Sequence, residues 1–468
     1  MKIWSLAFRN LLRNRRRSLA TVLALAIGSS AILLFGGYTT NVRYSMQTIY
    51  VRTGGHLQIQ HRDYFNYGSG NPAAYGIARY GQIVDAIRAD PTLAPMIMVV
   101  SPVLQFGGVA GNFDAGVSRT VLGTGYVPED VNKLRQWNAF GLRDRRPNFP
   151  LEGARADSAV IGHGVARVLL MCDSLKVPEE ACPKPVSPAA IAGGTAIPAD
   201  IAALAQGTTT QPDASVLKGN TRLELMVSQR NGAPNVAALN VVASESQGFK
   251  ELDELALMLP LAQAQKLVYG RNEPRATSIL VQLERTEQIP SAVRRIETLL
   301  SELAPQTPLG VLPFQVLNPF YVQTQRMFDT IFGFIFALIG GIVLFTVGNT
   351  MNAAVMERTV EIGTLRSLGL RQTGIRALFL TEGFVLGCVG AVIGAVVALL
   401  FASGFNALEL NWVPPAVSDE QPLSIILHGQ YQLLIGTTLG LIVIAVLSAW
   451  WPANRATRLS IVDALRHA

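Results

Sequence analysis

The residue types that most often carry out catalysis occur in this chain without a catalytic spacing. The chain contains no Gly-Lys-Ser or Gly-Lys-Thr, so it lacks the phosphate-binding loop of an ATPase. It also contains no Gly-x-Ser-x-Gly nucleophile motif, and its five histidines form no His-Glu-x-x-His zinc pair. We therefore expect a chain that is not an enzyme, with no catalytic residue, no metal site and no cofactor of its own.

Three cysteines remain as candidates for covalent chemistry. Cys172 and Cys182 lie close together in a polar region, whereas Cys388 lies in an apolar run. The first two form a disulfide if their region lies outside the cytoplasm. The alternative is a pair of free thiols in a flexible loop. Spacing alone does not decide between these, because a disulfide depends on backbone geometry.

The composition is that of an integral membrane protein. Of the 468 residues, 49% are hydrophobic and only 15% are charged, whereas soluble domains have about 25% charged residues. Four apolar runs each reach the roughly 20 residues that a transmembrane helix needs. We predict transmembrane helices at residues 18–40, 326–355, 373–404 and 429–452. A cleaved signal peptide is the alternative for the first run, although that run is longer than the usual apolar core of such a peptide.

The placement of the positive charges predicts the orientation. The first 17 residues hold six positive charges and no acid, and further arginines lie in segments 356–372 and 453–468. Segment 405–428 contains neither Lys nor Arg. Because Lys and Arg mark the cytoplasmic side of a span, we expect both termini in the cytoplasm. Residues 41–325 then form a large external domain and residues 405–428 a short external loop. No nucleic-acid-binding motif is present, so we expect no such partner.

The external segment shows both strand and helix patterns, which predicts an α+β domain. We predict strands at 56–60, 96–105, 119–123, 223–227, 236–243 and 278–283, and helices at 80–89, 159–171, 260–269 and 291–303. Residues 173–220 are rich in Pro, Ala, Gly and Thr, which predicts a flexible insertion. It is either a solvated loop or an arm that binds a partner.

The loop between the second and third spans, 356–372, predicts a short amphipathic helix. Ile362, Leu365 and Leu368 fall near one face, Glu357 and Glu361 lie one turn apart on another, and a glycine follows. Such a helix either lies on the lipid surface or docks a cytosolic partner.

Two further features lie on the third span. Gly383, Gly387, Gly390 and Gly394 form two Gly-x-x-x-Gly pairs, which let helices approach closely, either within one chain or in a dimer. Glu382 is the one acid of this apolar run. It reaches the interface or a basic neighbour such as Arg376, or it has a proton or substrate role.

The segment from Glu357 to Gly394, ERTVEIGTLRSLGLRQTGIRALFLTEGFVLGCVGAVIG, resembles the FtsX-like or MacB-type ABC transporter permeases. The beginning at 6–21, the ending at 452–466 and the order of one span, a large domain and three spans are also similar to that family. The resemblance implies that the inner helix docks on a cytosolic ATPase. The residues it implicates in this coupling are Glu357, Arg358, Glu361, Ile362, Gly363, Leu365, Arg366 and Gly369.

The resemblance also implies the location, a bacterial inner membrane, as well as the partners and the activity. Two permease chains, identical or different, would pair with two ATPase subunits that bind ATP and Mg²⁺. Because 17 residues precede the first span, we expect the ATPase to be a separate chain. ATP hydrolysis would move the external domain, a process called mechanotransmission, and so export or extract a lipoprotein, lipid, peptide or drug, with a periplasmic adaptor or lipoprotein as a further partner. The alternative is a regulatory permease that controls a cell-wall hydrolase without transport.

Overall fold

A computed structural model describes residues 3–143, 147–182, 221–230, 232–270, 273–413 and 420–458. Of the predicted insertion, residues 183–220 lie outside this described part. The chain divides into two compact units. The helical unit comprises Met1–Tyr44, Phe320–Asn411 and Pro422–Ala468, and the sheet unit comprises Ser45–Pro319 and Trp412–Gln421.

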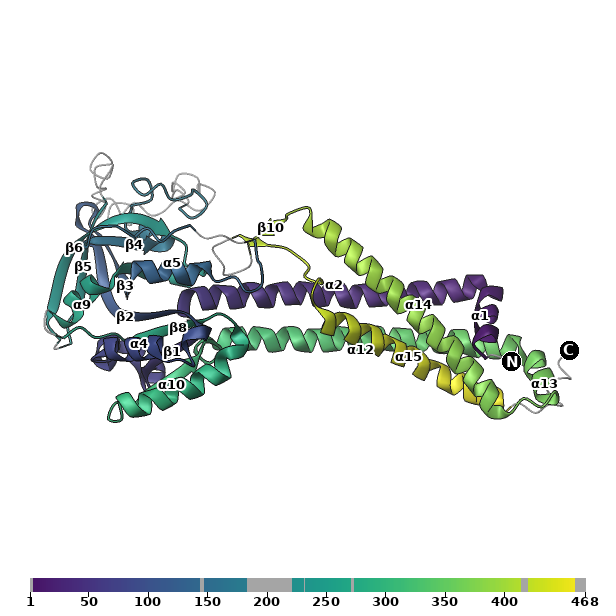
Figure 1. Cartoon of the computed structure of the whole chain (residues 1–468). Helices are drawn as coiled ribbons and strands as arrows, with labels where there is room; N and C mark the ends of the chain where they lie inside the picture. Colours follow the sequence, from purple (N-terminus) through teal and green to yellow (C-terminus); the bar gives the residue numbers. More distant parts are fainter. Residues whose placement is uncertain are drawn as a thin grey trace, which may run out of the picture. The chain divides into compact units, whose positions relative to one another are not determined.

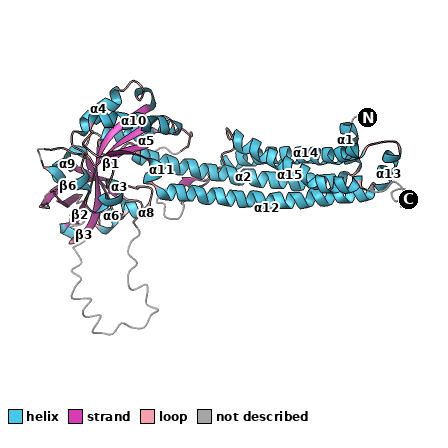
Figure 2. Ribbon diagram, turned by 90° about the horizontal axis from the view of Figure 1, so that it is seen from below, coloured by secondary structure: helices cyan, strands magenta, loops and turns pink. Residues whose placement is uncertain are grey.

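Four long helices carry the predicted spans. They are α2 (Arg15–Gly54), α12 (Pro319–Glu357), α14 (Gln372–Asn406) and α15 (Tyr431–Thr457), and each contains a stretch with a mean hydropathy between 2.2 and 2.7. Two shorter helices, α1 (Ile3–Arg13) and α13 (Thr359–Ser367), accompany them. Figures 1 and 2 place α1, α13 and both termini at the same end of this bundle. The short strands β10 (Asn411–Trp412) and β11 (Gln421–Pro422), which follow α14 in the chain, pair with each other.

The four glycines of the third span bring helices of this same chain together. A Cβ added at Gly383 would lie 2.7 Å from the Ala449 side chain of α15, and one at Gly394 would lie 2.5 Å from the backbone oxygen of Ala26 on α2. Gly387 faces α15 and Gly390 faces α2 in the same way. The two predicted alternatives were packing within one chain and packing in a dimer. In this structure the four glycines pack α14 against α2 and α15 of the same chain.

Hydroxyl groups supplement this close packing. Ser29 donates to the backbone oxygen of Ala391 at 3.1 Å, and the Ser30 hydroxyl lies 2.6 Å from the backbone oxygen of Ala26 in its own helix and 3.2 Å from that of Gly394. A hydroxyl that is buried in a helical bundle needs such an acceptor, because hydrocarbon offers none.

Within the described residues, nine strands form one sheet in the sheet unit, in the order β3-β7-β4-β6-β5-β2-β8-β1-β9. The strands are β1 (Leu57–His61), β2 (Ile97–Asn112), β3 (Val117–Tyr126), β4 (Ser158–Gly162), β5 (Arg222–Ser228), β6 (Pro234–Glu245), β7 (Ala256–Pro260), β8 (Ser278–Leu283) and β9 (Leu309–Pro313). The long strand β2 joins two parts of this sheet, β3-β7-β4-β6-β5 and β8-β1-β9. It pairs with β8 through its first residues and with β3 and β5 through its last.

Helices flank the strands of this sheet. They are α3 (Tyr64–Tyr67), α4 (Tyr80–Ala89), α5 (Pro128–Gln136), α6 (His163–Val168), α8 (Lys250–Asp253), α9 (Leu261–Tyr269), α10 (Ile289–Leu303) and α11 (Phe314–Leu317). One core lies among β2 to β7, α6 and α9, and the amphipathic α4 and α10 each bury one apolar face (Figure 1). The mixed content agrees with the predicted α+β class.

One predicted helix was wrong in its first part. Residues 159–171 were expected to be helical, but Ser158–Gly162 form strand β4, between β6 and β7, and the helix begins only at His163. All five residues of β4 are buried. A continuous apolar run is typical of a strand buried on both faces, and its periodicity does not distinguish it from a buried helix. Strands β7 and β9 were not predicted.

Cys172 and Cys182 are joined by a disulfide, with 6.3 Å between their Cα atoms. Cys388 has a free thiol.

Candidate functional site

The inner loop folds as the short helix α13, set off from its neighbours by two breaks. Helix α12 ends at Glu357, and Arg358 leaves the helical conformation with φ −106° and ψ 18°. At the other end, Gly369 has a φ of +90°. Only glycine adopts this left-handed region readily, so it ends α13 and lets the chain turn into α14.

A buried ion pair lies at the first of these breaks. Arg358 donates from Nη1 to Glu382 Oε1 at 3.0 Å, and the two side chains are only 7% and 2% exposed. Asn10 of α1 donates from Nδ2 to the same carboxylate oxygen at 2.8 Å, and Arg358 Nη2 donates to the backbone oxygen of Asn10 at 3.1 Å. These groups, which we call the Arg358 network, connect α1, the beginning of α13 and α14.

Of the alternatives predicted for Glu382, the structure shows a basic neighbour, but this neighbour is Arg358 and not the suggested Arg376. Arg376 donates to Asn454 Oδ1 at 2.8 Å and lies over the ring of Trp450, 5.8 Å from its centroid. Both of those partners belong to α15, so Arg376 connects α14 with the fourth span instead.

Two exposed ion pairs also join α1 and the beginning of α2 to the inner loop. Arg13 Nη2 lies 2.6 Å from Glu361 Oε1, and Arg17 binds both carboxylate oxygens of Glu357, at 2.5 and 2.9 Å. Water screens such pairs, so each is weak by itself. Both acids that were predicted to couple to an ATPase therefore face an arginine of this chain.

The other residues that were predicted to couple to an ATPase differ in the exposure of their side chains. Ile362 and Gly363 are buried, and Ile362 packs into the apolar core of the bundle, whereas Leu365 and Arg366 are half-buried. Four apolar side chains on and beside α13 remain exposed, which we call the exposed apolar set. They are Met356 (59%), Val360 (37%), Leu368 (79%) and Leu370 (37%). Exposed apolar groups beside charged ones are typical of a surface that binds another protein or the membrane.

Two family models match separate parts of the chain. Residues 330–461, which include α13 and α14, match the FtsX-like permease C-terminal region, and residues 18–179 match the MacB-like periplasmic core domain. The chain belongs to the FtsX-like, MacB-type ABC transporter permeases. The resemblance predicted from the sequence is thereby confirmed.

Several curated relatives share parts of this permease. An uncharacterised ABC transporter permease of Methanocaldococcus jannaschii is 25% identical over 48% of this chain and 54% of its own. The pyoverdine export ATP-binding/permease protein PvdT of Pseudomonas entomophila is 29% identical over 49% of this chain and 33% of its own. LolC of Haemophilus influenzae, a lipoprotein-releasing system transmembrane protein, is 26% identical over 31% of this chain and 36% of its own. The alignments thus span about half or less of these relatives' lengths.

One solved structure, the periplasmic region of MacB from Actinobacillus actinomycetemcomitans, aligns with 57% of this permease and 94% of its own chain. The two are 12% identical, with a TM-score of 0.32.

Sequence reasoning missed the residues that α1 contributes. Residues 1–17 were predicted as a basic, cytoplasmic amphipathic helix that flanks the membrane, but no partner was predicted for Asn10, Arg13 or Arg17. All three contact the inner loop or α14 of the permease. One signal was present for Asn10. It lies three residues after Ala7, which is completely buried, so it belongs to the inward face of an amphipathic helix.

Proposed function

We propose that this permease couples ATP hydrolysis by a separate cytosolic ABC ATPase to movements of its external unit, and so exports or extracts a substrate at the outer face of a bacterial inner membrane. The observation that supports this most is the Arg358 network, because it connects α13 to both α1 and α14. In this proposal the partner ATPase binds ATP and Mg²⁺, and this chain binds neither.

The charge distribution supports a cytoplasmic position for α13. It lies at the same end of the bundle as both termini (Figure 2), and this end carries the arginines of 13–17, 358–376 and 455–458. Positive residues favour the cytoplasmic side of a membrane. An ATPase in the cytosol therefore has direct access to the exposed apolar set.

The long helices offer a route for transmission. Helix α2 is continuous from Arg15 to Gly54 and leads into β1, while β9 leads through α11 into α12. Strands β1 and β9 are neighbours in the sheet, with Leu57 opposite Pro313. A shift of α2 along α12 would therefore move β1 and β9, two adjacent strands of the sheet unit, as in other transitions in which helices shift.

Our proposals for the substrate class and for the subunit stoichiometry are based on the relatives. The names of PvdT and LolC point to export of pyoverdine and to release of lipoproteins. We propose a substrate that is already at the outer face, and an assembly of two permease chains with two ATPase subunits.

Leu368 provides the test of ATPase docking. Leu368→Asp places a charge at the most exposed member of the apolar set, whereas Leu408→Asp places the same charge at a leucine beyond the other end of α14 that is 65% exposed. We expect the first variant to recover at least about tenfold less ATPase on co-purification in mild detergent, because central apolar contacts often contribute about 2 kcal/mol or more. The second should behave like the wild type. Normal ATPase recovery with Leu368→Asp would refute docking at α13.

A further inference from the structure

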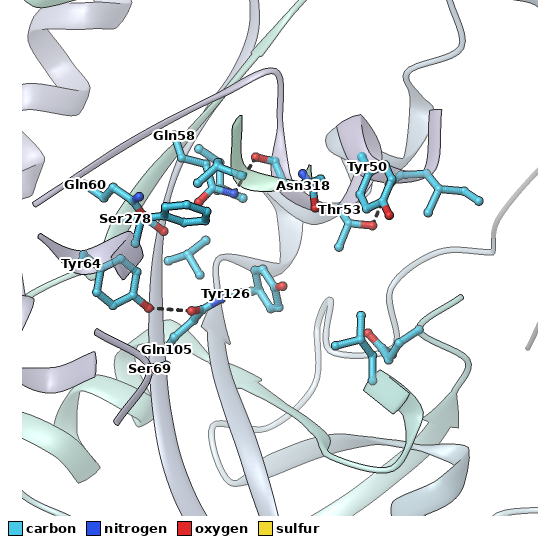
Figure 3. A pocket seen from close by; sticks show the side chains of 18 of the residues that line it. Tyr50, Thr53, Gln58, Gln60, Tyr64, Ser69, Gln105, Tyr126, Ser278 and Asn318 are labelled. Carbon is cyan, nitrogen blue, oxygen red and sulfur yellow. Dashed lines mark hydrogen bonds between the residues drawn. The ribbon is translucent and has the colours of Figure 1, made fainter. Parts of the chain in front are cut away.

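A cavity of about 350 Å³ lies within the sheet unit, beside the last turns of α2. Its walls are one face of β1, β8 and β2, the segment 64–69, and the residues just before α12. Figure 3 shows Gln60, Ser278 and Tyr64 on one side of it and Tyr50, Thr53 and Asn318 on the other. The volume lies in the lower part of the range for ligand pockets, about 300–1,000 Å³.

The lining of this cavity is polar but uncharged. Among its described lining residues there is no Asp, Glu, Lys, Arg or His. The polar groups are carboxamides and hydroxyls, and five aromatic rings lie among them. The carboxamides are those of Gln58, Gln60, Gln105, Gln247 and Asn318, and the rings are those of Tyr50, Tyr64, Phe65, Tyr126 and Phe249.

The strand face that lines the cavity differs from an ordinary core face. Gln58 and Gln60 of β1 and Gln105 of β2 line the cavity, whereas Leu57 and Ile59, which alternate with the glutamines of β1, are completely buried on the opposite face. A sheet face with glutamines in place of packed apolar groups favours binding of a polar molecule.

One of these glutamines has a donor without a partner. Gln60 is 1% exposed, and no atom of the described residues accepts a hydrogen bond from its Nε2. By contrast, Gln58 donates to the backbone oxygen of Gly54 at 3.1 Å, and Gln105 Oε1 accepts from the Tyr64 hydroxyl at 2.6 Å. A buried donor without a partner costs about 1–3 kcal/mol, so a ligand acceptor at this point would recover that energy.

We propose that this cavity binds an uncharged, amide-bearing ligand, of the kind presented by a short neutral peptide segment with an apolar side chain. Carboxamides both donate and accept, so they complement the backbone amides of such a segment. The aromatic rings suit its apolar side chain. A charged ligand would lose its hydration without gaining a counter-charge.

The position of the cavity connects this site to the proposed function, on which its role in transport rests. Ile49, Tyr50 and Thr53 of α2 line one part, and Leu317 and Asn318, which precede α12, line another. A shift of α2 along α12 would change the cavity, so the ATPase cycle would alter the affinity for the ligand.

Ligand binding is tested on the full chain in nanodiscs without any ATPase, by calorimetric titration. The probe is the blocked tripeptide acetyl-Ala-Phe-Ala-amide, and the comparison probes are acetyl-Ala-Lys-Ala-amide and maltose. Gln60→Leu removes the unpaired donor, and Ser69→Trp fills the exposed rim of the cavity. Ser228→Trp, at an exposed serine that ends β5 and does not line this cavity, is the matched control.

We expect the neutral tripeptide to bind, and both cavity variants to weaken its binding about tenfold or more while Ser228→Trp leaves it unchanged. The Gln60→Leu variant should be as stable to unfolding as the wild type, because the side chain loses no protein partner. If Gln60 had a purely structural role, its replacement would destabilise the fold. Absence of tripeptide binding, equal binding of the lysine peptide, preference for maltose, or no effect of Ser69→Trp would each overturn the proposal. None of these outcomes involves ATPase recovery, so failure here is distinct from failure of docking at α13.

Discussion

Neutralising Glu382 is expected to destabilise the permease much more than neutralising Glu361, although each carboxylate pairs with one arginine. The Glu382 and Arg358 side chains are 2% and 7% exposed, whereas those of Glu361 and Arg13 are 48% and 54% exposed. Removing one partner of a buried pair costs about 3–5 kcal/mol, because the other charge stays buried without compensation. Loss of an exposed pair costs about 1 kcal/mol or less.

Glu382→Gln keeps an oxygen that accepts from Asn10 but removes the charge that compensates Arg358. The double variant Arg358→Met with Glu382→Leu removes both charges and keeps similar volumes. We expect it to recover most of the loss, since apolar replacement of a whole buried pair is often neutral or stabilising.

The assay is equilibrium unfolding of the purified chain in mixed detergents, followed by tryptophan fluorescence. Trp4, Trp450 and Trp451 lie in the helical unit and report on it. If Glu382→Gln and Glu361→Gln lose the same stability within about 0.5 kcal/mol, the Arg358 network is not buried in the folded protein. If the double variant is no more stable than Glu382→Gln, the loss comes from packing and not from an uncompensated charge.

Three further predictions concern packing, the disulfide and pH. Gly394→Ala should cost about 1–3 kcal/mol in the same assay, because its Cβ meets α2, whereas Gly333→Ala, with no described atom within 4 Å, should cost nothing. Cys182→Ser should cost about 2–3 kcal/mol, measured against the oxidised wild type, because the disulfide closes a short loop. Burial lowers the pKa of His56 from 6.5 to about 4, so the unfolded chain binds the extra proton first. Stability should fall by about 3 kcal/mol as the pH drops from 6.5 to 4, and His56→Gln should remove this part of thermal-shift pH profiles.

The four long apolar helices, the α+β class and most of the strands could be predicted because they depend on local patterns. A run of uncharged residues, such as that from Gly383 to Leu408, identifies a membrane helix without knowledge of its neighbours. The helix at 80–89 was predicted with the bounds that the structure has, since its apolar residues repeat with helical spacing and Asp90-Pro91 follows.

The contacts of the candidate site could not be predicted in the same way. Asn10 and Glu382 are 372 residues apart in the chain, and nothing local indicates that they meet. Arg376 lies nearer to Glu382 in sequence, but six positions along a helix place it on a different face, whereas Arg358 approaches from the preceding break. The cavity likewise depends on pairing between β1, β8 and β2, which the single strands do not specify.

The difference between the two kinds of ion pair indicates which contacts an ATPase could change. The Arg13–Glu361 and Arg17–Glu357 pairs are exposed, so a docking protein with its own charges could replace them at little cost. The Arg358–Glu382 pair is buried, and breaking it would leave two uncompensated charges in an apolar surrounding. Docking at α13 would therefore rearrange the outer pairs while Asn10, Arg358 and Glu382 stay together. In that case α1, α13 and the beginning of α14 move as one body, and because α2 follows α1 after the single residue Asn14, this movement passes directly to the first span.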